Sequence, residues 1–317
     1  MSFKQTKFAG HAPAAVAAVI LAVQFFALHS DSAKAQMSAQ SLSAQSLSAP
    51  GLNAQGPATQ TSAVAGSNAK PVVGSAPATC TAPTDLARFE RPLIHTMRRL
   101  ANGQPLTIVA IGSSSTAGAG ASSPDTTYPS RLAVELRTRF PGREITVLNR
   151  GVNGEETDNM MARFAGDVLA AHPQLVLWQI GTNSVLRDHP LNPHAVQLHD
   201  GIEQLKGAGA DVVLIDPQFA PAVLAKSETS GMVEQIAIAA KQEDVDLFRR
   251  FAVMRDWHDV QHLSFGTFVS PDQLHMNDWS YACLAKLLGG AIAEAATRPI
   301  AAASVRPATI SARPDVH

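Results

Sequence analysis

Five short apolar runs divide the central part of the chain. They occupy residues 106–111, 145–148, 175–180, 212–215 and, most weakly, 245–248. Runs of this length that are rich in β-branched residues are typical of strands buried on both faces of a parallel sheet. We therefore predict five strands of one sheet.

The segments between the runs carry apolar residues at helical spacing. In residues 131–140, for example, Leu132, Leu136 and Phe140 recur every fourth position. Comparable patterns occupy residues 158–171, 195–206, 232–241 and 278–295. Strands that alternate with helices of this length are joined by right-handed crossovers. We expect an α/β fold of three layers, α/β/α, around a doubly wound parallel sheet of about five strands.

The first 35 residues have the composition of a secretory signal. Lys4 and Lys7 make a basic start, residues 14–28 are almost entirely apolar, and Ala33-Lys34-Ala35 offers the small-x-small pattern of a cleavage site. The apolar stretch is shorter than the ~20 residues of a spanning helix. A retained membrane anchor is the alternative. We expect cleavage after residue 35, export to the periplasm or the extracellular space, and no stable membrane insertion afterwards.

Low-complexity segments flank the predicted domain. Residues 36–79 repeat Ser-Ala-Gln-Ser-Leu and are then rich in alanine, glycine, proline and threonine, and a second such segment spans residues 298–317. Segments of this kind bury too little apolar surface to offset their ordering entropy. We predict a linker over residues 36–79, one catalytic domain over 80–297 and a disordered tail over 298–317.

Charge and cysteine content narrow the class of protein further. The 317 residues carry a formal net charge of -1, which gives no basic footprint for nucleic acid. Cys80 and Cys283 are the two cysteines of the chain and lie near the two ends of the predicted domain. In an oxidising compartment they could form a disulfide. The alternative is a pair of buried thiols.

Small polar residues follow the first three predicted strands. Gly112-Ser113-Ser114-Ser115-Thr116 follows the first, a segment containing Gly154 follows the second, and Gly181-Thr182-Asn183 follows the third. Asp272-Gln273-Leu274-His275 precedes the last predicted helix. Ligands of open α/β sheets bind at the carboxyl ends of the strands, so these four segments are expected to meet there.

Their residue types are those that acyl transfer requires. A serine of the triplet can be the nucleophile, His275 its base, and Asp272 the carboxylate that orients the imidazole. The Asn183 amide, the backbone N–H of Gly154 and the backbone N–H of the nucleophile can stabilise an oxyanion. Ser113 and Ser115 are expected to be turn residues that bond to backbone. Taken one at a time, the other residues also have plainer explanations, such as a positive φ at Gly154.

Together the four segments resemble the blocks of the SGNH hydrolases in the GDSL lipase/esterase superfamily, over roughly residues 106–295. The resemblance implies a flavodoxin-like fold and a triad of Ser114, Asp272 and His275. It further implies an oxyanion hole built by Ser114, Gly154 and Asn183.

Two residues depart from the family pattern. Ser113 stands where the family usually has aspartate before the nucleophile, and Ser184 follows Asn183 where aspartate is frequent. Neither departure removes a member of the catalytic set. Because serine replaces aspartate at both positions, we expect the hydrogen bonds inside these loops to differ from those usual in the family.

Other polar residues receive different interpretations. His258 and His262 are four positions apart, but Asp259 stands where the metalloprotease pattern requires glutamate, so we expect them to bind no metal. The predicted acyl transfer needs neither a metal nor a cofactor. Trp178 is predicted to be a core residue. Arg150 is predicted to hold the second loop or to bind an anionic substrate.

The sequence thus predicts an exported serine esterase that cleaves carboxylic esters, with short-chain acyl groups or O-acetylated glycans as expected substrates, through an acyl-Ser114 intermediate. One alternative is an acyltransferase acting on a periplasmic or extracellular glycan. Another is a glycan-binding module without catalytic activity.

Overall fold

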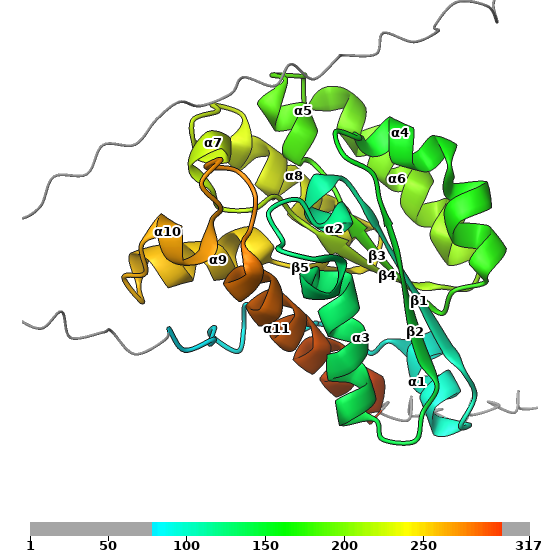
Figure 1. The fold of residues 1–317 in the computed structure, drawn as a ribbon. Coiled ribbons are helices and arrows are strands. Elements are labelled where there is room, and N and C mark those ends of the chain that lie inside the picture. The colour runs from blue at the N-terminus through cyan, green and yellow to red at the C-terminus, as the bar shows by residue number, and fades with distance from the viewer. Residues whose placement is uncertain (1–77, 300–317) are drawn as a thin grey trace, which may run out of the picture. The chain divides into compact units, whose positions relative to one another are not determined.

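The five strands of the structure lie in the segments that the apolar runs predict. A computed structural model describes residues 78–299 (Figure 1), so the predicted signal and most of the linker and tail lie outside the described residues. One parallel sheet has the strand order β2-β1-β3-β4-β5. Its strands are β1 (Leu106–Gly112), β2 (Ile145–Gly151), β3 (Leu175–Gln179), β4 (Asp211–Ile215) and β5 (Asp246–Phe248). The predicted fold class is confirmed.

Helices cover both faces of the sheet. They are α1 (Ile94–Ala101), α2 (Ser114–Ala117), α3 (Tyr128–Arg139), α4 (Thr157–Ala162), α5 (Thr182–Leu186), α6 (Asn192–Gly207), α7 (Pro221–Leu224), α8 (Thr229–Gln242), α9 (Arg250–Asp259), α10 (Phe265–Phe268) and α11 (Asp278–Thr297), with short turns η1 (Pro124–Thr126), η2 (Phe164–Val168) and η3 (Leu169–Ala171). Helices α1, α3 and α11 form one outer layer, and α4, α6 and α8 form the other (Figure 1). No helix of the described part combines the length and hydropathy needed to cross a bilayer.

The strand order places a switch point beside β1. The chain leaves β1 for its neighbour β2 on one side and then crosses to β3 on the other side. The loops after β1 and β3 therefore diverge at the carboxyl edge of the sheet, which is where doubly wound folds bind their ligands. Ser114, the first residue of α2, lies at this point.

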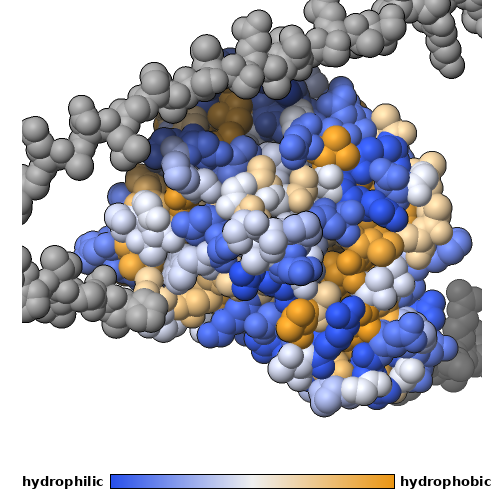
Figure 2. Space-filling view, in the orientation of Figure 1, coloured by the Kyte–Doolittle hydropathy of each residue, from blue (hydrophilic) through white to orange (hydrophobic). Residues whose placement is uncertain are grey.

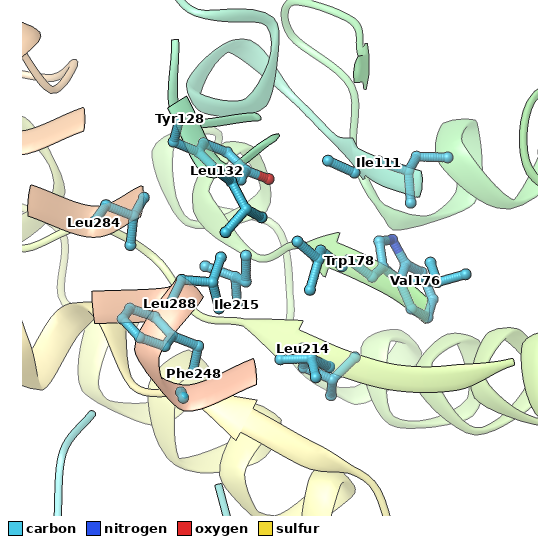
Figure 3. Packing of buried hydrophobic residues seen from close by; sticks show 14 of the residues in the cluster. Ile111, Tyr128, Leu132, Val176, Trp178, Leu214, Ile215, Phe248, Leu284 and Leu288 are labelled. Carbon is cyan, nitrogen blue, oxygen red and sulfur yellow. The ribbon is translucent and has the colours of Figure 1, made fainter. Parts of the chain in front are cut away.

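The interior is packed with the side chains of the apolar runs. Figure 3 shows Ile111, Val176 and Trp178 of the central strands on one side of the sheet and the labelled residues of α3 and α11 on the other. Trp178 is fully buried, as predicted, and packs edge-on against Phe164 with a centroid distance of 5.1 Å. Burying one large apolar side chain contributes about 1.5–3 kcal/mol to stability. The face of the molecule in Figure 2 is mostly hydrophilic, with smaller hydrophobic groups between the polar residues.

One predicted helix is broken. The pattern over residues 158–171 predicts a single helix, whereas the structure has α4, then the π-helical turn η2, then the 3₁₀ turn η3. Gly166 lies within η2 and has a poor helix propensity. Arg163, between α4 and η2, turns back to bond with the loop after β2. Tertiary contacts therefore override the helical pattern.

A disulfide closes the domain. It joins Cys80 in the first described segment to Cys283 in α11, with a Cα–Cα distance of 5.4 Å. Two tryptophans hold the same segment: Trp279 donates to the Ala78 carbonyl at 3.0 Å, and Trp257 donates to the Thr81 carbonyl at 2.9 Å. The N-terminal segment is thus fixed to α9 and α11.

Removing this disulfide is expected to lower the melting temperature. The bridge closes a loop with a sequence separation of 203 residues. The chain-entropy model gives such a loop at most about 5 kcal/mol, and measured losses are commonly about 2–5 kcal/mol. Calorimetry of the wild type and of a Cys80→Ala/Cys283→Ala variant, each with and without reductant, measures the effect. The variant should not respond to reductant. A wild type that keeps its melting temperature after both thiols are freed would contradict the prediction.

Candidate active site

The structure brings Ser114, His275 and Asp272 together across 161 residues of sequence. His275, in the loop before α11, places its Nε2 2.8 Å from Ser114 Oγ. Its Nδ1 lies 2.6 Å from Asp272 Oδ2. A hydroxyl, an imidazole and a carboxylate in this order have the geometry needed to remove a proton from the hydroxyl.

Asp272 is held by its own loop. The backbone N–H groups of Leu274 and His275 donate to its Oδ1 at 3.0 and 2.9 Å. Partial burial tends to raise the pKa of Asp272, but the hydrogen bonds from the His275 ring and the two N–H groups together outweigh it and lower that pKa. An ionised Asp272 accepts from Nδ1–H of His275, which leaves Nε2 as the acceptor facing Ser114.

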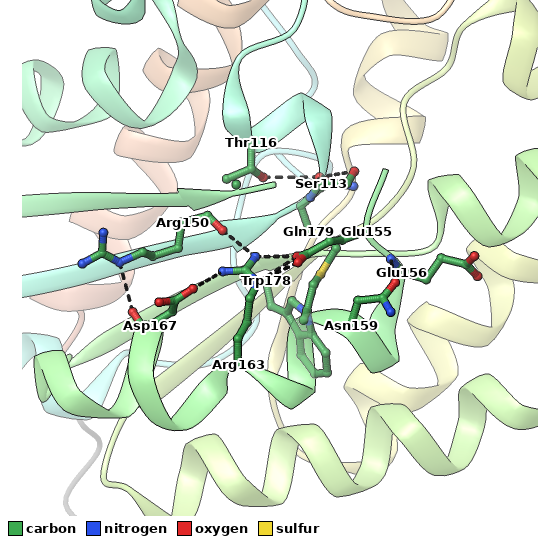
Figure 4. Close-up of polar contacts among 12 residues, drawn as sticks. Ser113, Thr116, Arg150, Glu155, Glu156, Asn159, Arg163, Asp167, Trp178 and Gln179 are labelled. Atoms are coloured by element: carbon green, nitrogen blue, oxygen red, sulfur yellow. Dashed lines mark hydrogen bonds and ion pairs between the residues drawn. The ribbon is translucent and has the colours of Figure 1, made fainter. Parts of the chain in front are cut away.

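Gln179 fixes the loop that carries Ser114. It is the last residue of β3 and is buried. Its Oε1 accepts hydrogen bonds from the Ser113 backbone N–H at 2.9 Å, the Ser113 hydroxyl at 3.1 Å and the Thr116 hydroxyl at 3.3 Å (Figure 4). Thr116 Oγ1 also lies 3.2 Å from the hydroxyl of buried Tyr128. A glutamine in an otherwise apolar run was the signal in the sequence for this role.

The expectation that Ser113 and Ser115 bond to backbone through their hydroxyls is wrong. Ser113 donates to the Gln179 side chain because that carboxamide lies beneath the turn. The buried Ser115 hydroxyl has no partner among the described residues. Ser113, at the usual place of an aspartate, is thus bonded to the neighbouring strand.

The predicted oxyanion donors lie in the loops after β1, β2 and β3. Within the described part of the chain, no group accepts from the backbone N–H of Ser114 or of Gly154. Gly154 has a φ of 80°, a conformation that favours glycine. Asn183 Nδ2 donates to the Glu155 carbonyl at 2.8 Å, which uses one of its two hydrogens. These groups can donate to an oxyanion.

Arg163, and not Arg150, holds the second loop. Its guanidinium binds the Glu155 carboxylate at 2.6 Å, the Asp167 carboxylate at 2.7 Å and the Arg150 carbonyl at 2.7 Å (Figure 4). The Arg150 side chain instead donates to the Asp167 carbonyl at 3.2 Å. Sequence spacing did not predict this role of Arg163, because its partners lie both before and after α4.

Glu156 ties the second loop to α5. Its carboxylate accepts from Ser184 Oγ at 2.8 Å, Arg187 Nη1 at 2.6 Å and His189 Nδ1 at 2.9 Å. Partial burial tends to raise the pKa of Glu156, yet these three hydrogen bonds lower it below its ordinary value. Ser184, where aspartate is frequent in the resembling family, is therefore a donor to Glu156.

The loop after α2 packs directly on the loop of His275. Gly120 has a φ of 87°, and a Cβ there would lie 2.2 Å from the Met276 carbonyl and 2.4 Å from Ser270 Oγ. Any side chain would therefore separate the two loops. Glycine at this position allows Ser114 and His275 to approach each other.

The paired histidines do not share a helical face. His258 stacks on Phe265 with a centroid distance of 4.4 Å, and His262 lies beyond the end of α9 with a φ of 56°. Over residues 78–299, no group of three or more histidine, cysteine, aspartate or glutamate side chains is arranged to hold a metal ion.

Known proteins with esterase activity resemble parts of this chain. An arylesterase of Vibrio mimicus is 35% identical over 81 residues, which are 25% of this chain and 40% of the arylesterase. A two-domain esterase active on acetylated mannans superposes with a TM-score of 0.57 and 19% identity, over 74% of this chain and 60% of that chain. This chain therefore spans less than two thirds of either protein.

An acetylxylan esterase from Geobacillus stearothermophilus superposes with a TM-score of 0.51 and 19% identity, over 59% of this chain and 94% of that chain. The likeness to the two solved structures concerns the fold. The match that covers the whole domain is the model of the non-GDSL lipase-like family, at residues 79–298. The chain belongs to this lipase- and esterase-like family.

Proposed function

We propose that the protein is a serine esterase of the SGNH type. The observation that carries the proposal is the chain of contacts from Asp272 through His275 to Ser114, with distances of 2.6 and 2.8 Å. The family match and the arylesterase relative support an ester substrate.

In the first half of the proposed reaction, Ser114 Oγ attacks the ester carbonyl carbon while His275 Nε2 takes the hydroxyl proton. The carbonyl oxygen becomes an oxyanion that accepts from the N–H groups of Ser114 and Gly154 and from Asn183 Nδ2. The carbon–oxygen bond to the leaving group then breaks, and protonated His275 returns its proton to the departing alcohol. The products of this half are the alcohol and acyl-Ser114.

In the second half, water attacks the acyl carbonyl and His275 takes a proton from it. The oxyanion forms again at the same donors. Collapse breaks the bond to Ser114 Oγ, which recovers its proton from His275, and releases the carboxylic acid. Asp272 stays ionised throughout and stabilises the imidazolium.

The proposed substrates are short-chain acyl esters, in particular O-acetylated glycans. Two structural neighbours are esterases of acetylated polysaccharides by their own descriptions. The Asp272 side chain is 47% exposed, so the loop of the base is open to a bulky substrate. The Cys80–Cys283 disulfide supports an oxidising compartment, and hence the proposed export.

A panel of esters tests the acyl preference. Aryl esters with acyl chains of two to twelve carbons, together with acetylated xylan and mannan, should show fastest turnover for acetyl esters and release of free acetate from the glycans. Purified wild type is the enzyme, and acetate is quantified directly. Hydrolysis of long-chain esters without acetate release would overturn the proposed substrate class. Acetyl groups moved to an added oligosaccharide would indicate the acyltransferase instead.

A further inference from the structure

Gln218 is a fully buried side chain between β4 and α7 that makes three hydrogen bonds to three other segments. Its Nε2 donates to the Leu274 carbonyl at 3.2 Å. Its Oε1 accepts from Thr182 Oγ1 at 3.0 Å and from Arg250 Nη2 at 3.0 Å. One carboxamide therefore connects the loop of the base, the start of α5 and the start of α9.

Two of these contacts are one residue away from the reacting groups. Leu274 directly precedes His275, and Thr182 directly precedes Asn183. Gln218 therefore links the segment of the proposed base to the segment of a proposed oxyanion donor. It makes no hydrogen bond to Ser114, His275 or Asn183 within the described residues. Gln218 can therefore affect the reaction only through the positions of these residues.

Arg250 fixes which way the carboxamide faces. Its guanidinium is buried, and its Nε donates to the Asp216 carbonyl at 2.8 Å, which holds it in place. A reversed Gln218 amide would set Nε2, a donor, against Arg250, which cannot accept, and Oε1 against the Leu274 carbonyl, which cannot donate. The Thr182 hydroxyl could rotate to accept from either orientation, so Arg250 and the Leu274 carbonyl set the orientation of the amide.

The loop of His275 is also restrained by hydrogen bonds within it and by the loop after α2, which packs on it at Gly120. Asp272 and Gln273 are exposed, and Gln273 has a φ of 62°. Besides the contacts inside the loop, the Ala222 backbone N–H donates to the Gln273 carbonyl at 3.0 Å. Gln218 and Ala222 both belong to the segment after β4, so this segment makes two hydrogen bonds to the loop of His275.

We propose that Gln218, oriented by Arg250, is a positioning residue that holds the loop of His275 in register with Asn183 and Ser114. The inference rests on the proposed function, because it assigns to Gln218 the alignment of that catalytic set. A displacement of about 1 Å at a catalytic group can cost on the order of 100-fold in rate.

Two substitutions of Gln218 remove its donor in different ways. Gln218→Glu keeps the shape and the acceptor for Thr182 and Arg250 but places an acceptor against the Leu274 carbonyl. Gln218→Met keeps the length, removes the donor and adds no charge. The matched control is Gln235→Glu in α8: the Nε2 of Gln235 donates to the Leu191 carbonyl at 3.0 Å, in the segment between α5 and α6, which contains none of the proposed catalytic residues.

The measurement is labelling by a fluorophosphonate probe, followed over time. The end point counts folded active sites, and the rate per labelled molecule reports how well His275 activates Ser114. Both Gln218 variants should label about 10–100-fold more slowly per molecule, by the cost of misplacement. Gln235→Glu should keep the wild-type rate.

Several outcomes would overturn the inference. Wild-type rates in both Gln218 variants, or a reduced end point with an unchanged rate, would make the residue structural only. Slow labelling of Gln218→Glu with a wild-type rate in Gln218→Met would assign the effect to charge. The Ser114→Ala variant tests the proposed function separately. If it is labelled or active, the mechanism itself is overturned, whatever the Gln218 variants show.

Discussion

The Ser114→Ala variant is expected to lose about 10⁴–10⁶-fold in kcat for acetyl-ester hydrolysis. The members of a serine–histidine–aspartate set act as a unit, and removing the nucleophile alone costs nearly as much as removing all three. The residual rate should come from substrate binding and the oxyanion donors. The melting temperature should hardly change, since Ser114 lies on the short helix α2 and its hydroxyl bonds to His275.

Ser115→Ala is the matched control for this prediction. Ser115 is the next residue of α2, and its buried hydroxyl has no partner among the described residues. The control removes the same atom one position away and should retain wild-type kcat. Initial rates on an acetyl ester, normalised to folded protein by circular dichroism, measure both variants. An active Ser114→Ala protein, or an inactive Ser115→Ala protein, would refute Ser114 as the nucleophile.

Asn183→Ala is expected to lower kcat by about 10²–10³-fold, the usual cost of one oxyanion donor. KM should change far less, because an oxyanion donor bonds more strongly to the transition state than to the ground-state carbonyl. One Nδ2 hydrogen of Asn183 bonds to the Glu155 carbonyl, and the other, which has no partner among the described residues, is the proposed donor to the oxyanion.

This substitution also frees the Glu155 carbonyl, so a control for loop loosening is needed. Asn159 is suitable because its Oδ1 accepts from the Glu156 backbone N–H at 3.0 Å and restrains the same loop without reaching Ser114. Asn159→Ala should therefore keep most of the wild-type kcat. If steady-state kinetics shows similar losses in both variants, the role of Asn183 is to support the loop.

The fold was largely predictable because its signals are local. Each strand is an apolar run, and each helical pattern reflects one buried face. Helix starts were less predictable: α3 begins at Tyr128, three residues before the predicted start, with Pro129 inside its first turn. The break after α4 was missed because Arg163 bonds to Glu155 and to the Arg150 carbonyl, both ahead of α4, as well as to Asp167, and the helical pattern does not show these contacts.

In the candidate site, too, some residues could be found from local sequence signals and others could not. Ser114, Gly154, Asn183, Asp272 and His275 lie at strand ends or before the last helix, and their types suggested roles.

The supporting residues could not be found in this way. Arg249 and Arg250 are adjacent in sequence, yet only Arg250 is buried. Gln218 differs from a surface glutamine only through the three segments that fold around it. Burial raises the pKa of Asp216 to about 7, and the residues next to it in the sequence do not predict this burial.

The Cys80–Cys283 bridge also determines how the domain would carry mechanical tension. A pull on the chain ahead of Cys80 would pass through the sulfur–sulfur bond directly into α11, and from there toward the C-terminus. The residues between the two cysteines, which include the whole sheet and Ser114, Asp272 and His275, lie outside this path. Tension between the two ends of the domain would therefore bypass the sheet and these three residues.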